Sequence, residues 1–333
     1  MVGALVAAGS PDDLSSAYAY CEKLAFAHYE NFPVASHLLP ARMRPHIAAI
    51  YAFARTADDF ADNPGIPDSE RLRLLDDWQR RLNAVVPSPD GGQTPNPAGR
   101  GQTPDPAQRG QTPNPAQRGQ TPSAETPSAE DRVFRALGNT IREHKLPASL
   151  FEDLLSAFRQ DVTTTRYHTW ADVLDYCRRS ANPVGRLVLR VAGFDDATLD
   201  AESDAVCTAL QLTNFWQDFA RDWQHGRLYV PVEDRDAAGA KDEDLDLQRL
   251  TPEWTSALRI VAGRTRAFFA AGRPVCDAVS GRLRWELRLT WLGGSRILDR
   301  LEAANFDVFN HRPSLGATDA PALLWDAFCW KRR

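Results

Sequence analysis

Two segments of this 333-residue chain carry acidic side chains four residues apart, each within a largely apolar stretch. Side chains four residues apart lie on the same face of an α-helix, so each segment predicts a helix with one acidic stripe. Carboxylates one turn apart repel each other by roughly a few tenths of a kcal/mol unless a cation lies between them. The spacing therefore favours a helical fold in which two such helices share a cation.

The first stripe lies in residues 51–62 and ends in a DDxxD-like string. Its members are Tyr51, Arg55, Asp58 and Asp62. By itself, such a string is as typical of a solvated helix C-terminus as of a metal site.

The second segment, residues 211–222, repeats the pattern and favours the metal site. Its polar face carries Gln211, Asn214, Asp218 and Asp222, and its opposite face carries Leu212, Phe215, Trp216 and Phe219. The apolar face predicts a core helix whose polar stripe faces an internal cavity, where carboxylates without partners would be costly. Hard oxygen donors from two facing helices suit Mg²⁺, which keeps waters and bridges to phosphate oxygens. The predicted ligands are Asp58, Asp62, Asn214, Asp218 and Asp222.

This donor set indicates a chemistry as well as a metal. Mg²⁺ that clamps a diphosphate stabilises the charge on the leaving group, so an allylic or cyclopropylcarbinyl C–O bond can break without a protein nucleophile. The carbocation then needs a dry pocket lined by aromatic rings. The 9 Trp and 15 Phe of the chain could line one. We therefore expect an isoprenoid diphosphate as the substrate.

Elsewhere, helical periodicity is common and strand signals are scarce. Helices are expected at 12–30, 41–62, 69–84, 131–144, 148–161, 170–192, 196–224, 252–279 and 283–304. The prediction is an all-α helical bundle with a central cavity, formed by a single domain over residues 1–333.

One insertion interrupts this domain, at about residues 87–130. A nine-residue unit recurs there, with Gln93, Gln102, Gln111 and Gln120 each opening a QTP triplet. Its prolines remove backbone donors, and its few apolar residues cannot offset the entropy of ordering. We expect a disordered surface loop without a role in the chemistry.

Composition excludes several classes of function. The formal net charge of −5 lacks the basic excess of a nucleic-acid-binding protein. Five cysteines without CxxC spacing predict neither a zinc site nor a disulfide framework, which fits the cytoplasm. No apolar run approaches the roughly 20 residues that span a bilayer. Membrane contact is therefore expected to be peripheral at most, and no amphipathic anchor stands out.

The two motifs together resemble those of the squalene/phytoene synthase family, which has the all-α isoprenoid synthase fold. The first motif is matched by Tyr51, Arg55, Asp58, Asp59 and Asp62, and the second by Gln211, Asn214, Asp218 and Asp222, with Arg227-Leu228-Tyr229-Val230-Pro231 after it. His28 and Phe32 match the substrate-binding stretch, and Tyr176, Val184 and Gly185 match the helix that borders the cation pocket. The resemblance implies that Asp58, Asp62, Asp218, Asp222 and Tyr176 are catalytic. It also implies that His28, Phe32, Tyr51, Arg55, Val184, Gly185, Gln211, Arg227 and Tyr229 bind substrate.

Within the family, residues 28–35 and 176–185 resemble the bacterial members that convert presqualene diphosphate and water to hydroxysqualene in hopanoid biosynthesis. Gln217 stands where condensing relatives often have a diphosphate-binding arginine, and Gly294 where they often have a tyrosine. The resemblance implies a Mg²⁺-dependent carbon–oxygen lyase that works with upstream and downstream pathway enzymes. The alternative is a relative that condenses two prenyl diphosphates head to head, and a non-catalytic helical scaffold is more remote.

Several of these residues also have structural interpretations. Tyr176 is equally typical of a hydroxyl bonded at a helix contact, and Arg55 of a salt-bridge partner for Asp58. Pro183 predicts a bend whether or not a cation lies nearby. Asp161 fits either an acceptor behind the site or a helix-end charge, and we do not count it among the site residues.

Overall fold

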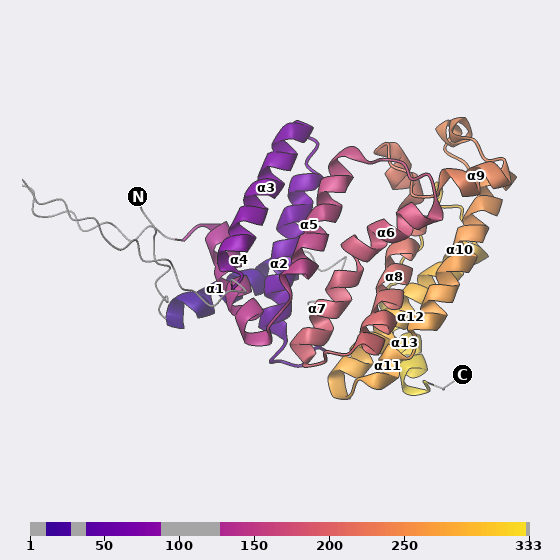
Figure 1. Ribbon diagram of the computed structural model, residues 1–333. Coiled ribbons are helices and arrows are strands. Elements are labelled where there is room, and N and C mark those ends of the chain that lie inside the picture. Colours follow the sequence, from indigo (N-terminus) through magenta and orange to yellow (C-terminus); the bar gives the residue numbers. More distant parts are fainter. Residues whose placement is uncertain (1–10, 28–37, 88–126, 331–333) are drawn as a thin grey trace, which may run out of the picture.

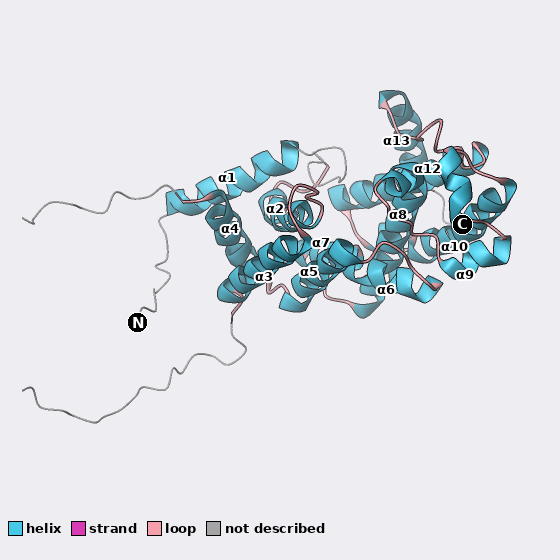
Figure 2. Ribbon diagram, turned by 90° about the horizontal axis from the view of Figure 1, so that it is seen from above, coloured by secondary structure: helices cyan, strands magenta, loops and turns pink. Residues whose placement is uncertain are grey.

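The computed structural model describes residues 11–27, 38–87 and 127–330. Helices make up most of this part of the chain. Its only β-type pairing is an isolated bridge between Arg166 and Leu228. The prediction of an all-α fold is confirmed, as Figure 2 shows.

The helices follow one another with short connections. They are α1 (Pro11–Ala27), α2 (Arg44–Ala61), α3 (Asp68–Val85), α4 (Ala129–His144), α5 (Ala148–Thr163), α6 (Trp170–Ser180), α7 (Asn182–Ala192), α8 (Ala197–Gln224), α9 (Val232–Ala238), α10 (Pro252–Gly272), α11 (Val275–Ala278), α12 (Gly281–Ala303) and α13 (Ala320–Phe328), with 3-10 helices at Asp242–Leu247 and Ala317–Asp319.

Proline breaks two of the helices that the periodicity predicted as continuous. The expected helix at 170–192 is α6 and α7, which meet at Ala181. Pro183 has no N–H to continue the hydrogen bonding of α6, so a new helix begins there. Pro274 likewise separates α10 from α11 within the expected helix at 252–279. The short helices α9 and α13 were not predicted.

Local capping explains where the central helices begin. The carboxylate of Asp196 accepts the N–H groups of Thr198 and Leu199 at the start of α8. A capping box between Thr169 and Asp172 begins α6. Such caps satisfy backbone donors that a helix start leaves free, at about 1 kcal/mol each.

Helix α8 is the hub of the bundle. It packs against α7 and α6 on one side and against α10 and α12 on the other, as Figure 1 shows. The Trp216 side chain is fully buried between α8 and α10, where its Nε1–H donates to Thr265 Oγ1 at 2.9 Å. Helix α2 contacts α5 and α7, so the two acidic segments belong to helices on opposite sides of α5 to α7.

Helices α3 and α4 flank the repeat segment, most of which, residues 88–126, lies outside the described residues. The two helices pack side by side. Arg81 of α3 forms ion pairs with Glu130 at 2.8 Å and with Asp131 at 3.2 Å in the first turn of α4. The chain therefore leaves and re-enters the bundle at neighbouring points, which suits an insertion.

Candidate active site between two acidic helices

The first acidic stripe, here called the α2 stripe, ends at the C-terminus of α2. Arg55 lies between two carboxylates of its own helix, with Nη1 at 3.2 Å from Asp58 Oδ2 and Nη2 at 2.5 Å from Asp59 Oδ1. Burial raises the pKa of Asp58 to about 6, and the charge of Asp62 adds to this, whereas Arg55 opposes it. The α2 stripe therefore carries more negative charge than its own arginine compensates.

The second stripe, here called the α8 stripe, occupies the last turns of α8. Asn214 Nδ2 donates to Asp218 Oδ2 at 2.8 Å. Arg312, from the loop after α12, donates two hydrogen bonds to the same carboxylate, from Nε to Oδ1 at 2.5 Å and from Nη2 to Oδ2 at 3.1 Å. Burial raises the pKa of Asp222 to about 7, and repulsion from Asp218 contributes. Again the stripe holds excess negative charge.

The opposite face of α8 is apolar and buried, as the sequence predicted. Leu212, Phe215, Trp216 and Phe219 each lie in the core. This packing fixes the rotation of the helix and leaves the polar stripe turned away from the core contacts with α10.

The two stripes meet at Arg227, in the loop that follows α8. Its Nη2 donates to Asp62 Oδ1 at 2.6 Å, and its backbone N–H donates to the carbonyl of Asp222 at 2.7 Å. The Asp62 charge also contributes to the raised pKa of Asp222. Acidic residues that are 160 positions apart in sequence thus act on one another, with a guanidinium between them.

A carboxylate from a third helix, Asp161 near the end of α5, joins this group. Its Oδ2 accepts a hydrogen bond from the Tyr176 hydroxyl at 2.8 Å. Burial raises the pKa of Asp161 to about 7, and the charges of Asp62 and Asp58 add to the shift. Sequence reasoning left Asp161 out of the site because nothing in its local string distinguishes it from a helix-end charge. Tyr176, Asp58 and Asp62 come close to Asp161 only in the folded protein.

Aromatic rings pack beside these carboxylates. Tyr229 stacks on Phe215 with ring centroids 3.7 Å apart and planes 4° apart, and Tyr167 lies 5.6 Å from Tyr229 on centroids. Tyr176 lies within 6.1 Å of Tyr229 on the same measure. Burial raises the pKa values of Tyr176 and Tyr229 well above the usual range, so both hydroxyls stay protonated.

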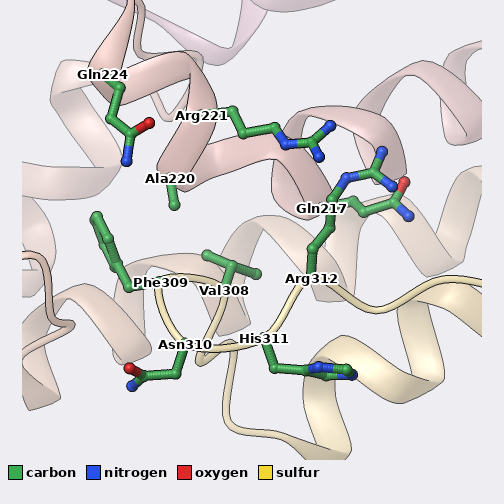
Figure 3. A pocket seen from close by; sticks show the side chains of 9 residues that line it. All are labelled: Gln217, Ala220, Arg221, Gln224, Val308, Phe309, Asn310, His311 and Arg312. Atoms are coloured by element: carbon green, nitrogen blue, oxygen red, sulfur yellow. The ribbon is translucent and has the colours of Figure 1, made fainter.

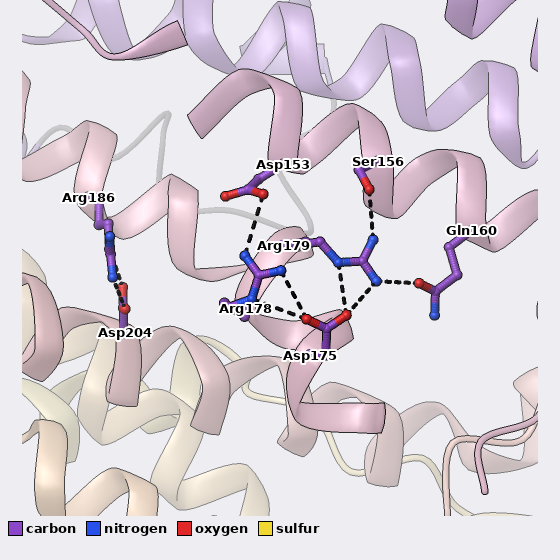
Figure 4. Close-up of polar contacts among 8 residues, drawn as sticks. All are labelled: Asp153, Ser156, Gln160, Asp175, Arg178, Arg179, Arg186 and Asp204. Atoms are coloured by element: carbon purple, nitrogen blue, oxygen red, sulfur yellow. Dashed lines mark hydrogen bonds and ion pairs between the residues drawn. The ribbon is translucent and has the colours of Figure 1, made fainter. Parts of the chain in front are cut away.

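An arginine network holds α6 in place so that Tyr176 reaches Asp161. Arg179 donates to Ser156 Oγ at 2.9 Å and to Gln160, both on α5 (Figure 4). Arg186 of α7 pairs with Asp204 of α8 through two hydrogen bonds in the same view. The first set of contacts joins α6 to α5, and the second joins α7 to α8.

Three comparisons with known proteins show the family and the fold of this chain. The profile of the family described as squalene/phytoene synthase matches residues 26–319. The chain belongs to this family. A hydroxysqualene synthase from Rhodopseudomonas palustris is 36% identical over 275 residues, which are 82% of this chain and 80% of that protein.

Solved structures extend the likeness of this squalene/phytoene synthase family member. Squalene synthase HpnC from Alicyclobacillus acidocaldarius superposes with a TM-score of 0.71 at 33% identity, over 89% of this chain and 97% of that one. A dehydrosqualene synthase superposes with a TM-score of 0.74 at 20% identity, over 96% and 98%. The fold is therefore that of the isoprenoid synthases, and the family acts on prenyl diphosphates.

The remaining predicted residues are placed as follows. Tyr51 and Gln211 are half-buried on their stripes, and Val184 is half-buried at the start of α7. His28 and Phe32 lie outside the described residues.

Gly185 makes a close helix contact. A Cβ there would lie 2.3 Å from Ser203 Oγ and 2.6 Å from Cys207 Sγ, so a glycine is required for α7 to approach α8. This packing reason accounts for the residue whether or not substrate also lies nearby.

A pocket adjoins the α8 stripe without containing any of the predicted metal ligands. It has a volume of about 290 Å³ and is lined by polar and apolar side chains of α8 and of the loop after α12 (Figure 3). Arg312 belongs to this lining and also binds Asp218, as described above. Gln217 lies beside it and donates to the carbonyl of Pro313 at 2.5 Å. The sequence carried no signal for Arg312, because its contact with Asp218 depends on how the loop after α12 packs against α8.

The acidic group fits a hard divalent cation. Its donors are carboxylate and amide oxygens, three of its carboxylates have raised pKa values, and an arginine already lies between the stripes. In the part of the chain that the structure describes, no three stripe carboxylates have ligand atoms mutually within 4.8 Å. Such spaced donors suit Mg²⁺, which completes its coordination with water and phosphate oxygens.

Proposed function

We propose that this protein converts presqualene diphosphate and water to hydroxysqualene and diphosphate in a Mg²⁺-dependent reaction. One observation carries the proposal: two acidic stripes from distant parts of the chain meet at Arg227 beside buried tyrosines and Asp161. The likeness to a hydroxysqualene synthase over most of the chain supports this choice within the family.

Asp58, Asp62, Asn214, Asp218 and Asp222 would hold the metal. When bound, Mg²⁺ neutralises the charge that builds on the departing diphosphate. Arg227 and Arg55 would bind diphosphate oxygens, because each guanidinium pairs with a carboxylate of the acidic group beside which that anion would bind. The hydroxyls of Tyr51 and Tyr229 are donors near the same group.

In the reaction, the C–O bond of the substrate breaks with its electron pair on the diphosphate oxygen. The stacked faces of Tyr229 and Phe215 are available to stabilise the resulting carbocation, because ring faces attract positive charge. Water then forms the new C–O bond and releases one proton. Asp161, with a pKa of about 7 and the Tyr176 hydroxyl 2.8 Å away, is suited to accept that proton and to orient the water.

The decisive experiment gives the purified protein presqualene diphosphate with Mg²⁺ in ¹⁸O-labelled water. The expected product is hydroxysqualene that carries the label, with unlabelled bridging oxygen left on the diphosphate. The Asp58→Asn variant should no longer release diphosphate. A non-catalytic helical scaffold would release none even as the wild type. Absence of a labelled alcohol from an active preparation would refute water capture.

A second candidate is head-to-head condensation of two prenyl diphosphates, favoured by the likeness to a squalene synthase at 33% identity. Farnesyl diphosphate alone separates the two. Turnover of farnesyl diphosphate to presqualene diphosphate or squalene would support the condensing enzyme, whereas the proposed function requires presqualene diphosphate in the reaction.

We further propose that the protein contacts membranes peripherally through α13. None of the described helices has the length and apolar character to cross a bilayer. Helix α13 nevertheless exposes Leu324, Trp325 and Phe328, the last two at 65% and 69% of their surface. Such an apolar face inserts into the interface of a bilayer. Replacing Trp325 and Phe328 by Ser should reduce co-sedimentation with phospholipid vesicles.

A further inference from the structure

Far from the acidic stripes, two histidines and a glutamate meet between α2 and α4. His46 lies in the first turn of α2, and Glu143 and His144 are the last two residues of α4. One ligand atom from each lies within 4.8 Å of the others. His46 Nε2 is 3.6 Å from Glu143 Oε1, and the two imidazole rings are 4.4 Å apart on centroids.

This cluster contains a polar atom that the protein itself leaves unsatisfied. His144 Nε2 is buried and has no hydrogen-bond partner. A buried polar atom without a partner is costly, so native proteins rarely retain one without a reason. The Glu143 side chain is 55% exposed, so an ion could reach the cluster from solvent.

Hydrogen bonds from neighbouring residues orient two of the three side chains. Thr140 Oγ1 and Tyr18 OH lie 3.0 Å and 3.2 Å from His46 Nδ1. If His46 carries its proton on Nδ1, either oxygen accepts it and Nε2 keeps a free lone pair towards Glu143. Asn139 Nδ2 donates to Glu143 Oε2 at 3.3 Å, which leaves Oε1 for the cluster. Metal-bound histidines and carboxylates characteristically have partners of this kind behind them.

The surroundings of His46 favour its neutral form, which can bind a cation. Burial and the neighbouring His144 keep the pKa of His46 below its ordinary value, while Glu143 opposes the shift. His46 is therefore neutral at neutral pH, as a metal ligand must be. The C-terminal end of α4, where Glu143 and His144 lie, carries the negative end of the helix dipole.

We propose that His46, Glu143 and His144 form a binding site for a divalent transition metal, with Zn²⁺ as the preferred ion. Two imidazoles and one carboxylate are donors that suit Zn²⁺, with water in the fourth position. The ion would clamp the start of α2 to the end of α4. Twelve residues of α2 separate His46 from Asp58, about 18 Å along the helix, so this site is distinct from the oxygen-donor site for Mg²⁺.

The test uses the full chain, freed of metal and kept in saturating Mg²⁺ so that the acidic stripes are occupied. Zn²⁺ binding is followed by calorimetry, and Co²⁺ replaces Zn²⁺ as a probe whose visible absorption reports nitrogen ligands. The variants are His144→Gln and Glu143→Gln. The matched control is His168→Gln, which removes an exposed histidine outside the cluster.

The expected result is one Zn²⁺ per chain and a rise in the melting temperature on binding. Affinity should fall at least about tenfold in His144→Gln and Glu143→Gln and stay unchanged in His168→Gln. Because Glu143 is exposed, its variant remains informative if His144→Gln fails to fold. Equal Co²⁺ spectra in wild type and both cluster variants, or no Zn²⁺ binding by wild type, would overturn the proposal. Diphosphate release with Mg²⁺ is measured separately, so failure of the proposed function leaves this result unaffected.

Discussion

The α2 and α8 stripes look alike in sequence but are neutralised in different ways. On α2 the compensating cation is Arg55, one turn from Asp58 on the same helix. On α8 the cation hydrogen-bonded to Asp218 is Arg312, from a loop 94 residues further along the chain, while Arg221 of the same helix lies 3.8 Å from that carboxylate. Asp58 and Asp59 are therefore paired within their own helix, whereas the hydrogen-bonded counter-charge of Asp218 depends on the folded C-terminal region.

The arginines on both stripes show how a metal site can remain stable before its ion binds. Arg227 links the two stripes by pairing with Asp62 and bonding the Asp222 carbonyl. Even so, Asp58, Asp161 and Asp222 keep raised pKa values. Burial is the largest cause of these raised pKa values, and the arginines reduce the added repulsion without removing it, so a divalent ion that neutralises the carboxylates is favoured.

The largest expected effect comes from removing one carboxylate from each stripe. Asp58→Asn and Asp222→Asn should each lower the rate of Mg²⁺-dependent diphosphate release between about 100-fold and 1,000-fold. Each variant loses a ligand of the Mg²⁺ that stabilises the charge on the departing diphosphate. Steady-state kinetics with presqualene diphosphate measure this. Asp77→Asn, at a half-buried position of α3 whose carboxylate pairs with Arg80 and Arg81, is the control that should retain activity. A stripe whose variant stays active would not belong to the site.

The next effect separates the two counter-charges. Without metal, Arg312→Gln should lower the free energy of unfolding by about 1–3 kcal/mol, because it deprives the largely buried Asp218 carboxylate of two donors. Arg55→Gln should cost at most about 1 kcal/mol, since its partners are more exposed. Urea unfolding measures both. Equal losses would mean that the stripes do not differ in this way.

A smaller effect is expected at Asp161. Tyr176→Phe removes the hydrogen bond to Asp161, which holds that pKa down, so the pKa of Asp161 should rise above about 7. The acid limb of the rate profile should move to higher pH, and stability should change by about 1 kcal/mol. A pH–rate profile tests this against the wild type. A uniform loss of rate at every pH would instead indicate a purely structural hydroxyl.

The smallest effect is the pH dependence of the metal-free protein. Asp58, Asp161 and Asp222 have folded pKa values near 6 to 7, above those of the unfolded chain, so the folded state binds more protons in this range. Their contribution to stability is therefore greatest below about pH 4 and decreases as pH rises through about 7. At about pH 8, adding Mg²⁺ should raise the melting temperature by a few degrees, because the ion neutralises the ionised carboxylates. A melting temperature that is insensitive to Mg²⁺ would contradict the raised pKa values as a sign of a metal site.

Much of the fold could be predicted from local pattern. Helical periodicity located α2, α3, α4, α5, α8 and α12 closely, because an apolar face must be buried on one side of each helix. The break between α6 and α7 was not predicted as a helix end, although Pro183 indicated a bend. The short helices α9 and α13 carry too few turns for periodicity to show.

The residues of the candidate site also fall into those that local pattern could identify and those that it could not. The stripe residues could be recognised because residues one turn apart on a helix share a face whatever the rest of the chain does. Asp161 and Arg312 could not, since a carboxylate at a helix end and an arginine in a loop have no periodic context. Gly185 was recognised by resemblance, and its contact with Ser203 and Cys207 appears only once α7 meets α8.

By itself, the sequence determined which helices form and which of their faces carry acid, because both depend on interactions within a few residues. Only the tertiary structure decided that these faces meet at Arg227, that Asp161 and Tyr176 lie beside them, and that His46 lies against the end of α4. The physical reason is one of range. Backbone hydrogen bonds act locally, whereas burial and charge depend on which distant segments the core brings together.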